Sequence, residues 1–299
     1  MKNTFLPISM VILSLHLIVC IAAAGNPSTI PMSKKKVEAP SAPLSLRGAI
    51  LQNEDRGTFL LYSAVEYRQN WEAPLSGIKG DLKRFGVIRL DYYVSRNVVI
   101  QIRGAVKQIL DIEATSPTGA ENLKRSSASD VGDFSIASLA YFFTERAHYP
   151  AFGLRMETTL PNTNQNNGLG TNTTDLQISL FGKKTYQQIT LYADMGIGIL
   201  TAPLNFNNQN DVFVYRTGIL ARISNRLQLA GEISGFHSTR NWVPIGTESR
   251  GIGQIGLTRN FRNVALEFFT VHGLNQREGD WGIILGLSTQ VNFLASLLK

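Results

Sequence analysis

The stretch WGIILGLSTQVNF, residues 281–293, alternates between two kinds of side chain. Its odd-numbered positions are apolar except Thr289 and carry aromatic rings at both ends, whereas its even-numbered positions are mostly glycine or small polar residues. An alternation of period two is typical of a β-strand with two different faces. Twelve steps of about 3.3 Å, tilted by about 40°, span roughly 30 Å, which suits the lipid-facing band and aromatic girdles of an outer-membrane barrel. The stretch therefore predicts a membrane-spanning strand.

The same alternation recurs along the chain and predicts about twelve strands. The others lie at residues 58–68, 82–94, 98–110, 131–143, 150–160, 174–182, 188–200, 212–224, 227–237, 250–260 and 264–273. Short and long polar connections alternate between them, as in outer-membrane barrels with short periplasmic turns and long external loops. The predicted fold is all-β: a transmembrane antiparallel β-barrel over residues 58–293 with both termini periplasmic. The alternative, a soluble β-sandwich, would bury its apolar face in a shared core and needs no alternation of connections.

The two ends of the chain are predicted to lie outside the barrel. Residues 1–24 have a basic start, an apolar run and a small-residue end, which is typical of a secretory signal peptide. The alternatives are an uncleaved membrane anchor and lipid attachment at Cys20, against which the bulky Val19 before it argues. Residues 25–57 are predicted to form a flexible periplasmic segment, and residues 294–299 a C-terminal tail. Cleavage would remove the only cysteine, which excludes thiol chemistry in the mature chain.

The composition excludes several classes of protein. Charged residues make up 17% of the chain, against about 25% in soluble globular domains. A hydrophobic share of 43% excludes disorder, and a single cysteine excludes a disulfide scaffold and a cysteine-ligated zinc site. No spacing of metal ligands occurs, and no cofactor is expected. The formal net charge is +7, but the basic residues are spread over many predicted strands, so no nucleic-acid partner is expected.

The predicted inward and outward faces differ in charge. Charged residues gather on the inward face, whereas the outward midspan positions carry none, because charge facing lipid costs about 2–4 kcal/mol. The candidate lumen-lining residues are Arg89, Asp91, Arg103, Lys107, Arg155, Glu157, Arg216, Arg222, Glu232 and Glu267, together with Glu66 and Asp194. The candidate girdle aromatics are Tyr67, Tyr92, Phe134, Phe142, Phe152, Phe213, Trp281 and Phe293. The charged face predicts either a polar lumen that passes or binds a small solute or an ion-pair network that only fills the barrel.

Two further segments carry a resemblance to a known family. The segment DVGDFSIASLAYFF, residues 130–143, is followed by LPNTNQNNGLGTNTTD, residues 160–175. In this order they resemble the outer-membrane transporter family named for the meta-cleavage pathway of phenol degradation. The resemblance implies a small barrel for uptake of hydrophobic or aromatic compounds, with no solute identified. Barrel proteins also usually finish on an aromatic residue that the barrel-assembly machinery reads, and Phe293 fits that position.

Three functions remain open at this stage. The first is an outer-membrane channel or transporter of a Gram-negative bacterium, in contact with outer-membrane lipid and a small solute. The second is a structural or adhesive barrel whose external loops bind a partner. The third is a lipid hydrolase, which would need a serine activated by a histidine on the outer face. His237 and Ser238 are adjacent and so point to opposite faces of a strand, and we therefore expect no enzyme activity.

Overall fold

The computed structural model describes residues 40, 42–48, 54–114, 126–202 and 208–292. These residues form thirteen strands and two short 3-10 turns, η1 (Gln165–Asn167) and η2 (Gln276–Glu278). The strands are β1 (Thr58–Glu72), β2 (Lys79–Ser95), β3 (Val98–Ala114), β4 (Ser127–Asp130), β5 (Phe134–Phe143), β6 (Ala151–Leu160), β7 (Asp175–Tyr186), β8 (Ile189–Thr201), β9 (Gln209–Arg222), β10 (Leu227–Ser238), β11 (Arg250–Asn260), β12 (Val264–Gly273) and β13 (Trp281–Asn292). No helix within these ranges is long and apolar enough to cross a membrane.

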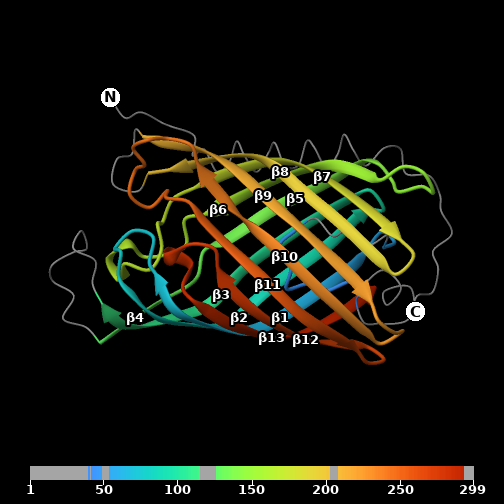
Figure 1. Cartoon of the computed structure of the whole chain (residues 1–299), viewed down its shortest axis with the longest axis horizontal. Helices are drawn as coiled ribbons and strands as arrows, with labels where there is room; N and C mark the ends of the chain where they lie inside the picture. Colours follow the sequence, from blue (N-terminus) through green and yellow to red (C-terminus); the bar gives the residue numbers. More distant parts are fainter. Residues whose placement is uncertain (1–39, 41, 49–53, 115–125, 203–207, 293–299) are drawn as a thin grey trace.

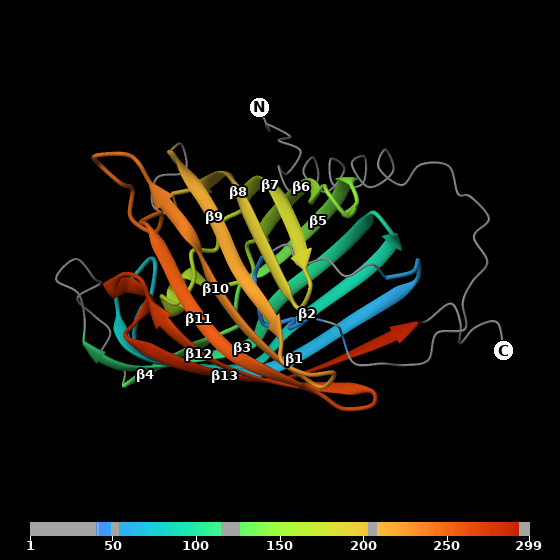
Figure 2. The same cartoon turned by 45° about the vertical axis from the view of Figure 1, so that its right-hand side comes forward.

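The strands close into one antiparallel barrel (Figures 1 and 2). Apart from β4 and β5, which do not pair with each other, strands that are neighbours along the chain pair, and β1 pairs with β13, where Thr58 lies opposite Asn292. The short β4 and the longer β5 pair with successive parts of β3, so together they occupy one position in the wall. The barrel therefore has twelve strand positions, which confirms the predicted fold. The strand predicted at residues 131–143 is β5, which begins at Phe134, and the short β4 before it was not predicted.

Short and long connections lie at opposite ends of the barrel. Residues 96–97, 187–188 and 261–263 form short turns, whereas residues 161–174 and 239–249 form long loops at the other end. The start of β1 and the end of β13 are both at the short-turn end. This order agrees with the alternation predicted from the sequence.

The outer face is apolar and carries aromatic residues near both rims. On β8, Leu191, Met195 and Ile197 each expose more than half of their surface, as expected of side chains in contact with lipid. Six of the eight predicted girdle aromatics lie toward strand ends: Tyr67, Phe213 and Trp281 at the long-loop end, and Tyr92, Phe142 and Phe152 at the short-turn end. The Phe134 ring lies over Gly104 at the start of β5. Phe293 lies outside the described residues.

The wall of the barrel is irregular where β2, β3 and the break between β4 and β5 lie side by side. This irregularity overturns the prediction for one lumen residue, Lys107. Gly86 in β2 has a φ of +59°, and the register between β1 and β2 shifts there. Beside it, β4 and β5 are interrupted opposite β3. Lys107 in β3 lies opposite the exposed Phe85 and is itself exposed, so it faces outward rather than into the lumen. The inward face resumes at the buried Gln108, because the irregularity shifts the alternation by one residue.

Candidate functional site in the barrel lumen

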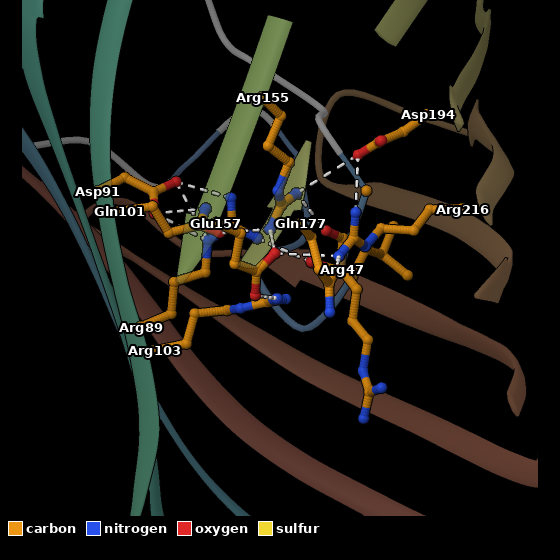
Figure 3. Close-up of polar contacts among 12 residues, drawn as sticks. Arg47, Arg89, Asp91, Gln101, Arg103, Arg155, Glu157, Gln177, Asp194 and Arg216 are labelled. Carbon is orange, nitrogen blue, oxygen red and sulfur yellow. Dashed lines mark hydrogen bonds and ion pairs between the residues drawn. The ribbon is translucent and has the colours of Figure 1, made fainter. Parts of the chain in front are cut away.

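A buried ion-pair network crosses the lumen around Glu157 on β6 (Figure 3). Its carboxylate accepts from Arg155 at 2.8 Å and from Arg216 at 3.0 Å, and it also pairs with Arg103. Arg216 in turn lies 3.2 Å from Asp194 on β8. Four strands, β3, β6, β8 and β9, thus supply a single cluster, and each charge in it has an opposite charge beside it. Such mutual pairing is what permits several charges to be buried together.

A second group extends this network along the lumen. Asp91 accepts from the Arg89 guanidinium at 2.7 Å and from Gln101 at 2.9 Å. Gln101 also accepts from Arg155 at 3.1 Å, which joins the two groups. The predicted residues Arg89, Asp91, Arg103, Arg155, Glu157 and Arg216 are therefore brought together inside the barrel.

Glu232 and Glu267 bind a backbone segment that was predicted to lie outside the barrel. Glu267 accepts from the backbone N–H groups of Leu44 and Ser45, at 3.0 and 2.9 Å. Glu232 accepts from the backbone N–H groups of Arg47 and Gly48, at 2.9 and 2.7 Å. Residues 42–48, APLSLRG, therefore lie inside the lumen (Figure 2), and we call them the plug segment.

Arginines bind the carbonyl groups of the plug segment. Arg89 donates to the carbonyl oxygens of Leu44 and Leu46, at 3.1 and 2.8 Å, and Arg155 donates to that of Arg47 at 2.7 Å. Backbone N–H groups and backbone carbonyl groups of the plug segment thus both have hydrogen-bond partners, as a buried backbone requires. The sequence interpretation of residues 25–57 as a flexible periplasmic segment is wrong for residues 42–48. The predicted signal peptide, residues 1–24, lies outside the described residues.

The plug segment also packs against apolar residues of the wall. Leu44 and Leu46 are 3% and 1% exposed and belong to a buried cluster with Leu60, Tyr62 and Ile284. A Cβ added to Gly48 would lie 2.2 Å from the Tyr192 ring, so only glycine permits this approach to the wall. Apolar packing and hydrogen bonding therefore hold the same seven residues.

The remaining predicted lumen residues fall in different places. Glu66 and Asp194 are buried and form ion pairs, whereas Arg222 is exposed at the last position of β9, at the short-turn end. Six charged residues that line the lumen and its mouth were not predicted: Arg47, Arg68, Arg84, Asp133, Arg250 and Glu278. Arg68 shares the inward face of Glu66 at a spacing of two, a signal that could have found it.

A cavity of about 350 Å³ lies between the plug segment and the long loops. Within it, Glu66 pairs with Arg68 at 2.5 Å and with Arg84 at 3.2 Å. Glu278 pairs with Arg68 at 2.5 Å and with Arg250 at 3.4 Å. Burial alone would raise the pKa of the Glu278 carboxyl, but the charges of Arg68 and Arg250 outweigh it and lower that pKa. Glu278 is therefore ionised at neutral pH.

Trp71 lies beside two of these arginines at the wall of the cavity. The guanidinium groups of Arg84 and Arg250 lie 5.6 and 5.7 Å from the centre of its ring, within the range of a cation–π contact.

Among the described residues, His237 and Ser238 do not form the serine–histidine pair that a lipid hydrolase would need. His237 Nδ1 lies 3.2 Å from Ser249 Oγ rather than beside Ser238, and no other side chain in the described part of the chain orients the ring. A serine hydrolase needs a third group to fix its histidine. Within the same ranges, no three histidine, cysteine or acidic residues form a cluster that could hold a metal ion.

Comparison with known proteins identifies the fold. No protein-family model matches the sequence, and no curated protein matches it. An outer-membrane channel of Pseudomonas putida F1 is similar in structure, with a TM-score of 0.55 and 14% identity over 82% of this chain and 98% of that chain. The NanC porin has a TM-score of 0.49 and 6% identity over 77% of this chain and 98% of its own. LpxR from Salmonella typhimurium has a TM-score of 0.39 and 9% identity over 79% and 100%.

The likeness to the Pseudomonas channel shows that this chain has the fold of an outer-membrane barrel. Membership of the phenol-degradation transporter family stays a prediction.

Proposed function

We propose that the protein is a channel for a small solute in the outer membrane of a Gram-negative bacterium, with both termini in the periplasm. The closed barrel with an apolar outer face supports the location, because lipid-exposed backbone must be fully paired in a membrane. Outer-membrane lipid and the barrel-assembly machinery would then be its partners. We infer no enzyme activity.

The observation that carries the proposal is the way the lumen is filled. A barrel that serves only as a scaffold can be filled by side chains of its own wall. Here a separate peptide segment, residues 42–48, occupies the lumen and is bound by Glu232, Glu267, Arg89 and Arg155. A segment that is bound rather than built into the wall can move, and its movement would open a path through the barrel. The ion pairs around Glu157 would then line that path.

Planar-bilayer recording tests this function. We expect a folded barrel beginning at Glu54, which lacks the plug segment, to carry a steady ion current, and the full chain to carry a smaller one. Heat-modifiable gel mobility shows in each case that the barrel is folded. A folded barrel that carries no current without the plug segment would contradict the proposal and favour a structural or adhesive role.

A further inference from the structure

The cavity above the plug segment carries more positive than negative charge. Six arginines and three carboxylates contribute to its lining: Arg47, Arg68, Arg84, Arg89, Arg103 and Arg250, with Glu66, Asp133 and Glu278. Arg89 is neutralised by an ion pair with Asp91, and Arg103 is neutralised by an ion pair with Glu157. Of the other four arginines, three form ion pairs with two carboxylates among the described residues: Arg68 and Arg84 with Glu66, and Arg68 and Arg250 with Glu278.

Arg47 is the exception in this arrangement. Its backbone is fixed by Glu232 and Arg155, but its guanidinium forms no ion pair and no hydrogen bond with any described residue. Figure 3 shows its side chain pointing away from the network around Glu157. Asp133, which also contributes to the lining, forms no ion pair in the described part of the chain. The carboxylates of Glu278 and Glu66 act on this guanidinium only through space. A half-buried guanidinium that makes no direct ion pair with a described residue is costly, and a planar anion such as a carboxylate is its natural partner.

The lining also has an apolar part. Trp71, Leu169, Ile252 and Ile284 contribute side chains, and three of them come from different strands while Leu169 comes from the long loop between β6 and β7. A volume of about 350 Å³ holds a small organic molecule but not an extended chain. An occupant that satisfies both parts of the lining has one anionic group and a compact apolar body.

We propose that this cavity binds a small carboxylate with an apolar body and that Arg47 is its principal charged contact. The proposal rests on the proposed channel function, because it names the class of solute and places its binding site at the plug segment. Since Arg47 belongs to the plug segment itself, the bound anion would contact the element that blocks the lumen.

Titration calorimetry of the full chain in detergent tests the proposal, with benzoate as the anion and benzyl alcohol as a neutral probe of similar shape. We expect benzoate to bind more tightly than benzyl alcohol and to bind more weakly as salt is added. The variant Arg47→Gln should lose about tenfold or more of the benzoate affinity, since a hydrogen bond to a charged group is lost. Arg47→Lys, which keeps the charge, should lose less.

The matched control is Arg240→Gln, which removes an exposed arginine of the long-loop end that pairs with Asp211. Its benzoate affinity should equal that of the unaltered chain. Absence of benzoate binding at millimolar concentration, equal affinity for both probes, or an unchanged affinity in Arg47→Gln would each overturn the proposal. Binding in detergent is independent of ion current. Binding without current would therefore refute the channel function alone, and current without binding would refute this site alone.

Discussion

Replacing Glu232 and Glu267 together by glutamine is expected to raise the time-averaged conductance of the full chain about tenfold or more. These two carboxylates accept four backbone N–H bonds from the plug segment, at 2.7 to 3.0 Å. Hydrogen bonds to a charged acceptor contribute about 1.5–3 kcal/mol each, and an amide oxygen contributes less. The plug segment should therefore leave the lumen more often. Planar-bilayer recording measures the change directly.

The control for this prediction is Glu145→Gln. Glu145 lies between β5 and β6 and binds Lys184 and Thr185 at the short-turn end, away from the plug segment. Its replacement should leave the conductance unchanged. A folded double variant of Glu232 and Glu267 whose conductance equals that of the unaltered chain would show that the carboxylates do not hold the lumen closed.

The second large effect is expected at Glu157. Its carboxylate is 4% exposed and lies among Arg103, Arg155 and Arg216. The variant Glu157→Ala leaves Arg155 and Arg216 with Asp194 as a close counter-ion and leaves Arg103 without an ion pair among the described residues. Removing one partner of a buried ion pair costs about 3–5 kcal/mol. Urea unfolding of the barrel in lipid vesicles should show a loss of that size.

Two comparisons isolate the charge effect at Glu157. Glu145→Gln, which breaks a partly exposed ion pair, should cost less than about 1 kcal/mol. Adding Arg103→Gln to Glu157→Gln should cost less than the sum of the single effects, because the two residues share one interaction. A loss below about 1 kcal/mol in Glu157→Ala would mean that the network contributes little to stability.

The strands were predictable because each depends on a local pattern. Alternation with period two places the last strand at residues 281–293, and the structure has it at Trp281–Asn292. The error at Lys107 has a physical cause, since simple alternation does not account for the shift beside Gly86. The same shift turns Arg84 inward, where it pairs with Glu66. A glycine inside a strand is a sequence signal for such a shift.

The plug segment was not predictable in the same way. Residues 42–48 form no strand or helix, and their position depends on partners more than 180 residues away, Glu232 and Glu267. The sequence did predict that both glutamates face the lumen, but not that they bind backbone N–H groups rather than arginines. The role of Arg47 follows only once its neighbours are known.

The central claim is that residues 42–48 occupy the lumen, and the reactivity of two adjacent positions tests it most directly. Both residues border the cavity, but Leu46 is 1% exposed and buried, whereas Arg47 is partly exposed. In a chain with Cys20→Ser, the variants Leu46→Cys and Arg47→Cys are treated with a membrane-impermeant thiol reagent. The cysteine at position 47 should react at least about tenfold faster, since access governs thiol reactivity. Equal and rapid labelling at both positions would contradict the claim, because it would place the segment outside the barrel.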